Sequence, residues 1–148
     1  MSYRIEEFDN LKTKVLKYVL YKKRTEQEIK QKFINEESEI LSDVIEYLKE
    51  AGYISDEEYI SRAINEFMAL KNLSIKEIKY KLLSKGIDKN ALDDYISNHQ
   101  EELLEYEKNS LEKLINKKIN SQEIEELEAY LMKKGYKYDL IKEAIRKV

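Results

Sequence analysis

Hydrophobic residues recur every three or four positions along most of the chain, which is the period of an amphipathic helix. The stretch LSIKEIKYKLLSKGI (73–87) shows this pattern clearly. Ser74 and Glu77 have the spacing of a capping box, in which two side chains bind free backbone N–H groups at a helix start. Gly86 can adopt the left-handed conformation that ends a helix. We therefore predict one helix here, and a second helix that begins at Asp88.

The same pattern recurs at a spacing of 49 residues. Downstream, Gly135 takes the place of Gly86, and hydrophobic positions on both sides of it match. Upstream, Thr25 takes the place of Ser74, and four residues within 28–32 are identical to their counterparts. One short helical unit buries little apolar surface alone, so repetition of this kind predicts units that stack.

The predicted fold is all-α, with three tandem three-helix repeats that form an elongated, curved array of nine helices. The predicted units are 1–54, which includes an N-terminal extension, 55–98 and 99–148. Helices of the first unit are predicted at 9–23, 26–34 and 37–51. In the third unit we expect Leu103 and Leu104 to face inward, and Asn120 or Ser121 to cap the second helix.

Composition supports this helical fold and limits the chemistry of the protein. The chain has 148 residues, three glycines, and neither proline nor cysteine. Without cysteine, disulfides and thiolate metal sites are excluded. The first ten residues lack the apolar segment of a secretory signal, and no apolar run approaches the roughly 20 residues of a membrane span. We expect a cytoplasmic, monomeric protein with no membrane association.

Residues suited to catalysis are scarce in this sequence. His99 is the single histidine, and phosphate-binding or hydrolase motifs are missing from the sequence. The acidic run at 56–58 falls in the first turn of a predicted helix, where negative charge is stabilising. We therefore predict a protein that is not an enzyme and has neither a cofactor nor a metal.

Charge is distributed in bands, although the net charge is only −3. Residues 12–35 carry a net charge of +6, residues 36–58 a net charge of −8, and residues 71–89 a net charge of +4. Such bands can form basic and acidic faces in the folded protein, and an acidic face would suit a basic surface on a partner. The alternative interpretation is a set of solvated helix surfaces.

Lysines occupy matching positions in the first two repeats, and evenly spaced cations along a groove suit a polyanion. The candidate residues for binding a partner or DNA are Lys22, Lys23, Arg24, Lys30, Lys32, Lys76, Lys79, Lys81 and Lys85. For the first three, stabilisation of a helix end is an equally good explanation. A helix-turn-helix reading of 74–96 is disfavoured, because its second helix would bring acidic residues to DNA.

Three segments resemble the successive repeats of the RecX regulatory proteins. GYISDEEYISRAINEF (52–67), which leads into 73–87, resembles the middle repeat. VLKYVLYKKRTEQEI (15–29) is similar to the signature of the first repeat, and YLMKKGYKYDLIKEAI (130–145) to the end of the third. The resemblance covers essentially residues 11–146.

This resemblance implies a regulator that binds the RecA recombinase filament on single-stranded DNA and inhibits strand exchange and ATP hydrolysis. Many members of the family also bind DNA, so single- or double-stranded DNA is a further expected ligand. The residues that match the family's motifs are Lys22, Lys23, Arg24, Tyr53, Asp56, Gly86 and Gly135. Two alternatives stay open: a helical scaffold for a different protein partner, and a nucleic-acid-binding protein that acts alone.

Overall fold

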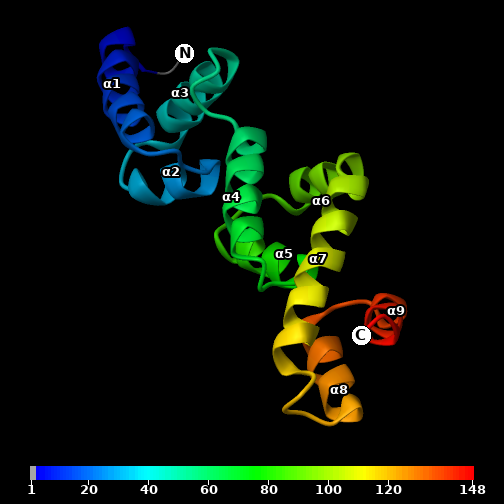
Figure 1. Cartoon of the computed structure of the whole chain (residues 1–148). Coiled ribbons are helices and arrows are strands. Elements are labelled where there is room, and N and C mark those ends of the chain that lie inside the picture. Colours follow the sequence, from blue (N-terminus) through cyan, green and yellow to red (C-terminus); the bar gives the residue numbers. More distant parts are fainter. Residues whose placement is uncertain (1–2) are drawn as a thin grey trace.

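The computed structural model describes residues 3–148, and within this range it contains nine α-helices and no strand. The helices are α1 (Ile5–Tyr21), α2 (Glu26–Lys32), α3 (Ser38–Glu50), α4 (Asp56–Leu70), α5 (Ile75–Ser84), α6 (Lys89–Asn98), α7 (Gln100–Lys118), α8 (Ile124–Lys134) and α9 (Tyr138–Arg146). They follow one another along an elongated molecule, with α1 at one end and α8 at the other (Figure 1). The predicted all-α fold is confirmed. None of these helices is long and apolar enough to cross a membrane.

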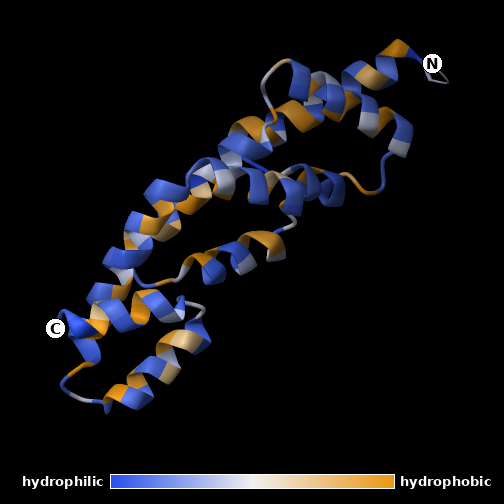
Figure 2. Cartoon of the chain, turned by 90° about the vertical axis from the view of Figure 1, so that its right-hand side faces the viewer, coloured by the Kyte–Doolittle hydropathy of each residue, from blue (hydrophilic) through white to orange (hydrophobic). Residues whose placement is uncertain are grey.

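Three hydrophobic cores lie one after another along the molecule. We refer to α1–α3 as unit 1, α4–α6 as unit 2 and α7–α9 as unit 3. Val15 and Leu48 lie in the core of unit 1, Leu82 in that of unit 2, and Leu131 in that of unit 3. Apolar and polar residues alternate along the helices (Figure 2), so each helix has one face available for a core. Burial of each such side chain contributes roughly 1.5–3 kcal/mol to folding.

Helix α7 belongs to two of these cores. Leu103 and Tyr106, in its first half, pack in the core of unit 2. Leu111 and Ile115, in its second half, pack in the core of unit 3. The core of unit 2 therefore includes residues on both sides of the predicted boundary between residues 98 and 99. The predicted division of the chain into three domains stays a prediction.

The predicted capping residues of α2 and α5 are confirmed. The Thr25 hydroxyl accepts a hydrogen bond from the Glu28 N–H at 3.0 Å, and Ser74 accepts one from Glu77 at 3.1 Å. Both glutamates complete the capping box. The left-handed conformation predicted at Gly86 is also present, with φ of +87°.

Some predicted details at helix ends and faces are wrong. Helix α8 begins at Ile124 and not at 120–121, because the Ser121 hydroxyl donates to the Lys118 carbonyl at 3.2 Å and so belongs to the end of α7. Helix α1 begins at Ile5, four residues earlier than predicted. Leu104 is exposed, because the inward face of α7 is the one that carries its neighbour Leu103.

Candidate partner-binding grooves

Two open grooves lie where the second helix of one unit meets the second helix of the next. Groove 1 is lined from unit 1 by Tyr18, Gln27, Glu28, Gln31 and Lys32, and from unit 2 by Leu83, Ser84, Lys85 and Gly86. Groove 2 is lined from unit 2 by Phe67, Lys76, Glu77, Tyr80, Lys81, Ser84 and Lys85, and from unit 3 by Lys133 and Lys134. Ser84 and Lys85 line both grooves, so the grooves adjoin at the end of α5.

The grooves are equivalent by sequence position. Each of the five residues that unit 1 contributes to groove 1 has its counterpart in groove 2 exactly one spacing of 49 residues later. Ser84 and Lys85 on the far side of groove 1 correspond in the same way to Lys133 and Lys134 on the far side of groove 2. The repeat found in the sequence therefore places the same surface twice along the molecule.

Close approach of helix ends creates each groove. Gly86 follows the end of α5, and a Cβ atom added to it would lie 2.7 Å from Cγ of Gln27, near the start of α2. Gly135 follows the end of α8, and a Cβ atom there would lie 2.8 Å from Cβ of Lys76, near the start of α5. Both glycines have positive φ, so conformation and space favour glycine at these two positions.

At the second contact, a buried serine joins the two helices. Ser74 is fully buried and caps α5, while its hydroxyl donates to the Lys134 carbonyl at 2.6 Å. The Lys134 ammonium lies 3.1 Å from the Glu77 carboxylate. The capping box of α5 therefore also holds the end of α8 in place.

Groove 2 is strongly basic. Its lining has five lysines and one glutamate, and that glutamate is paired with Lys134. Two aromatic rings lie among the lysines: Tyr80 is 73% exposed, and Phe67 has the Lys85 ammonium 5.8 Å from its ring centroid. Groove 2 therefore presents ammonium groups and aromatic ring faces to an anionic partner.

The structure brings four of the nine predicted residues to the grooves. Lys32 lines groove 1, Lys76 and Lys81 line groove 2, and Lys85 lines both. Lys30 lies instead in a separate hollow between α2 and α3. Whether any of these residues contacts a partner stays a prediction.

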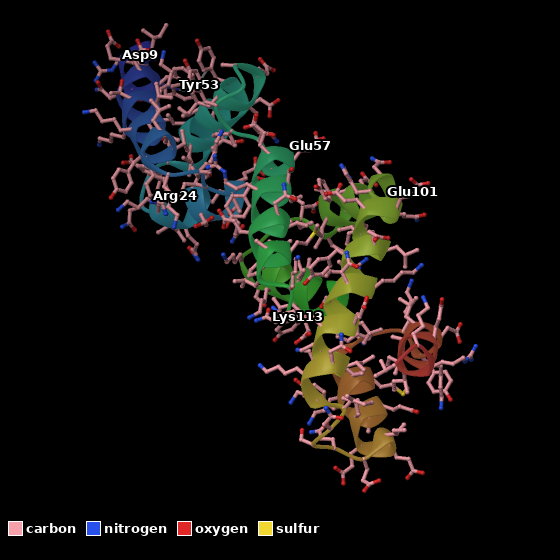
Figure 3. The ribbon with its side chains drawn as sticks, in the orientation of Figure 1. Asp9, Arg24, Tyr53, Glu57, Glu101 and Lys113 are labelled. Atoms are coloured by element: carbon pink, nitrogen blue, oxygen red, sulfur yellow. The ribbon has the colours of Figure 1, made fainter. Side chains whose placement is uncertain are left out.

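The remaining predicted residues lie outside the grooves. Lys79 forms an ion pair with Asp93 at 2.8 Å, within unit 2. Lys23 pairs with Glu58 at 2.8 Å. The Arg24 guanidinium lies 4.2 Å from the ring centroid of Tyr18, in the turn between α1 and α2 (Figure 3).

Lys22 is exposed directly after α1 and lines neither groove. Two lysines of groove 2, Lys133 and Lys134, are missing from the candidates predicted from sequence. The 49-residue spacing could have identified Lys134, because it is the counterpart of the candidate Lys85, whereas Lys133 is the counterpart of Ser84 and gives no such signal.

Two carboxylates bind the starts of the second helices. Asp56 of α4 accepts a hydrogen bond from the Glu26 N–H of α2 at 3.2 Å, and Glu107 of α7 accepts one from the Ile75 N–H of α5. Burial raises the pKa of Asp56 and of Glu107, although the charge of Lys137 partly opposes this for Glu107. Both carboxylates therefore have a role in holding neighbouring units together.

The single histidine is part of a helix end. The His99 ring stacks on Tyr95 at a centroid distance of 3.9 Å, and its Nδ1 atom lies 2.8 Å from the Tyr95 carbonyl oxygen. Residues 3–148 contain no group of three or more acidic or histidine side chains that could hold a metal ion. The grooves, rather than a catalytic cluster, are the candidate site.

Comparison with known proteins places the chain in a family, although no family model matches it. The regulatory protein RecX of Clostridium perfringens is 30% identical over 154 residues, which cover 97% of this chain and 70% of the relative. The chain belongs to the RecX family of regulatory proteins. RecX of Finegoldia magna is 34% identical over 139 residues, covering 86% of this chain and 66% of the relative. RecX of Staphylococcus carnosus is 29% identical, and the chain spans about half of its length, 51%.

Solved structures of RecX proteins share the fold. The crystal structure of RecX from Lactobacillus salivarius matches with a TM-score of 0.77 at 24% identity, over 97% of each chain. A second crystal structure of a regulatory protein RecX matches with a TM-score of 0.71 at 23% identity, over 95% of this chain and 73% of that one. The helical array described above is therefore the RecX fold.

Proposed function

We propose that this protein is a non-enzymatic cytoplasmic regulator that binds RecA recombinase filaments on single-stranded DNA. By binding there, it inhibits the recombinase and ATPase activities and so modulates recombination and DNA repair. Membership of the RecX family and the two grooves at equivalent positions, of which groove 2 is strongly basic, support this proposal. The grooves carry the argument, since they give the array a repeated binding surface.

A repeated surface suits a partner that is itself repetitive. Successive subunits of a filament present the same surface at regular intervals, so groove 1 and groove 2 can contact successive copies of one feature. Each contact adds to the others when all can form together, which raises the overall affinity far above that of one groove. The protein then acts by occupying the filament groove or by clamping adjacent subunits.

The buried polar groups fit a protein that works by binding. Ser74, Ser110 and Glu107 are buried polar residues where units 2 and 3 meet, and each hydrogen-bonds from one unit to the other. These groups hold units in position and are not accessible to a substrate. The exposed lysines of groove 2 are left for the partner.

The experiment that tests this proposal is the single-stranded-DNA-dependent ATPase of the cognate RecA. We expect marked inhibition when this protein is present at substoichiometric amounts, because one array contacts several filament subunits. An unchanged ATPase rate with this protein in excess would contradict the proposal. In that case a helical scaffold for a different protein becomes the leading function.

A protein that binds nucleic acid alone is the second candidate, and the combination of lysines with Tyr80 in groove 2 favours it. Exposed aromatic rings stack on unpaired bases, and lysines neutralise phosphates. Binding to bare single-stranded DNA would then fall steeply with salt, with a slope set by the number of phosphates contacted. Measurement of this slope without RecA separates the two candidates.

A further inference from the structure

We infer that unit 1 is a hinged arm, while units 2 and 3 move together as one rigid body. This inference does not depend on the proposed function, because it compares only the two joints of the array. Joint 1 is the set of contacts between units 1 and 2, and joint 2 is the set between units 2 and 3.

Joint 2 is built around a shared helix. Leu103 and Tyr106 of α7 pack in the core of unit 2, while Leu111 and Ile115 of the same helix pack in the core of unit 3. A change of angle between these units would require α7 to bend or one of the cores to open. Packed cores resist such deformation, so the shared helix makes joint 2 stiff.

Hydrogen bonds with little access to water reinforce joint 2. The Tyr106 hydroxyl donates to the Leu73 carbonyl at 2.6 Å, and the Ser110 hydroxyl lies 3.3 Å from the same oxygen. Across the same joint, the Ser74 hydroxyl of unit 2 donates to the Lys134 carbonyl of unit 3. These groups would lose their partners if the units moved apart, and buried polar groups without partners are costly.

Joint 1 has a different construction. Among the described residues, the cluster of buried residues in unit 1 includes none from α4, and the cluster in unit 2 includes none from α1–α3. No helix therefore enters both cores. The chain passes from Leu48 in α3 to the start of α4 through the short segment around Tyr53 (Figure 3).

The close approach of Gly86 to Gln27 and a few polar contacts, without a shared helix, hold joint 1 together. Lys23 pairs with Glu58 at 2.8 Å, and these side chains are 43% and 61% exposed. Asp56 accepts a hydrogen bond from the Glu26 N–H at 3.2 Å. Lys49 lies 3.4 Å from the Glu26 carboxylate and reinforces this contact from within unit 1. Exposed ion pairs contribute at most about 1 kcal/mol each and are screened by salt.

The difference between the joints has a consequence for the grooves. Groove 1 lies across joint 1, between Lys32 and Lys85, so its width changes as the arm moves. Groove 2 lies across joint 2, between Lys81 and Lys133, so its width is fixed. Groove 2 is the preformed half of the surface, and groove 1 is the half that adapts to a partner.

Distances between pairs of spin labels test this inference. The chain has no cysteine, so labels can be placed freely at exposed positions. The pair S42C and N65C spans joint 1, and the pair N65C and A129C spans joint 2. We expect a broad distance distribution for the first pair and a narrow one for the second.

Salt sharpens the test, because the Debye length falls from about 10 Å at about 0.1 M salt to about 3 Å at about 1 M. The distribution across joint 1 should broaden over this range, and that across joint 2 should not change. A narrow, salt-independent distribution across joint 1 would overturn the inference. Equal broadening across both joints would also overturn it, since units 2 and 3 would not then be one body.

Substitution of Lys23 and Lys49 tests whether their ion pairs are what restricts the motion of joint 1 at low salt. Lys23→Gln together with Lys49→Gln should broaden the joint 1 distribution at about 0.1 M salt to its width at about 1 M. Lys17→Gln together with Lys22→Gln is the matched control, because these exposed lysines lie outside both ion pairs. Equal broadening in the control would show that net charge, not the joint, controls the motion, and would contradict the inference.

Discussion

Groove 1 and groove 2 occupy equivalent places in the array but present different charges. The lining of groove 2 has five lysines and one glutamate, whereas that of groove 1 has two lysines and one glutamate. The largest changes are Lys76 in place of Gln27 and Lys133 in place of Ser84. The positions that line the two grooves repeat at a spacing of 49 residues, but the charges of the residues at those positions differ.

This difference separates what the fold requires from what binding requires. The joints need a glycine after each of α5 and α8 and a capping box at the start of the neighbouring helix. These features are present in both joints. Lys134 pairs with Glu77 and Lys76 lies against Gly135, but the structure requires neither Lys81 nor Lys133, which is why we expect these two to be the stronger contacts with the partner.

Charge reversal in groove 2 should have the largest effect. In the variant Lys76→Glu, Lys81→Glu, Lys133→Glu, the groove repels an anionic surface that the native groove attracts. We expect the Kd for RecA filaments on single-stranded DNA to rise on the order of a hundredfold, or about 2.7 kcal/mol. Fluorescence anisotropy with a labelled filament measures this change.

The matched control changes the net charge equally, outside both grooves. Lys17→Glu, Lys108→Glu, Lys117→Glu alters three exposed lysines of α1 and α7. We expect less than a threefold change in Kd, a loss of under about 0.7 kcal/mol. Equal losses in the two variants would mean that groove 2 has no special role.

The joint glycines should have the next largest effect, on stability. At Gly135 a methyl group would meet Lys76 at 2.8 Å with φ of +103°, whereas at Gly52, with φ of +84°, nothing lies within 4 Å. Gly135→Ala should lower the free energy of unfolding by about 2 kcal/mol, and Gly52→Ala by about 1 kcal/mol, since only the first adds a steric clash to backbone strain. Urea denaturation measures both, and equal losses would show that the contact with Lys76 is unimportant.

A smaller effect is expected at the buried carboxylate of joint 2. Burial raises the pKa of Glu107, so the folded protein holds this proton more tightly than the unfolded chain. The free energy of unfolding therefore falls as pH rises above the ordinary glutamate value. Glu107→Gln keeps an oxygen that accepts from the Ile75 N–H, and should stabilise the protein by roughly 1 kcal/mol at neutral pH.

Urea denaturation at pH 5 and pH 8 tests this linkage. The native protein should lose more stability between the two values than Glu107→Gln does. Glu105→Gln, at an exposed position of the same helix, serves as the control and should follow the native protein. If Glu107→Gln is less stable than the native protein at both pH values, the ionised carboxylate is favourable and the expected sign is wrong.

The smallest effect is expected for Lys79, whose ammonium is engaged by Asp93 at 2.8 Å on the partly exposed surface of unit 2. Lys79→Gln should lower the free energy of unfolding by no more than about 0.5 kcal/mol and leave filament binding unchanged. Lys81→Gln, two residues away in groove 2, should weaken binding without loss of stability. Equal weakening by the two variants would place the contact surface outside the groove.

Local signals in the sequence predict much of the fold. The capping boxes at Thr25 and Ser74 and the left-handed Gly86 each depend on residues close together in the chain, and all three are confirmed. The failures are of two kinds. The Ser121 hydroxyl could cap either the end of α7 or the start of α8, and the sequence does not distinguish the two. Leu103 and Leu104 are adjacent, so the hydrophobic pattern fits two different inward faces of α7.

The candidate site is harder to predict, because its contacts join residues far apart in the chain. A helical wheel places Lys79 and Lys81 on opposite sides of one apolar stripe, but it cannot show that Asp93 engages one of them. It also cannot show that Lys133 faces Lys81 across a groove. The sequence predicts the position of each lysine on its own helix, whereas the identity of its partner on another helix is known only from the packed structure.

Because both joints repeat at the same spacing, the array could be lengthened by adding whole repeats. Residues 75–123 contain α5, α6 and α7 and are one full period of 49 residues. If this segment occurred twice, the first α5 would meet the Gly86 of the second copy in place of Gly135, and a third groove would form in the same register. The number of equivalent grooves in a protein of this design is therefore set by how many 49-residue periods its sequence contains.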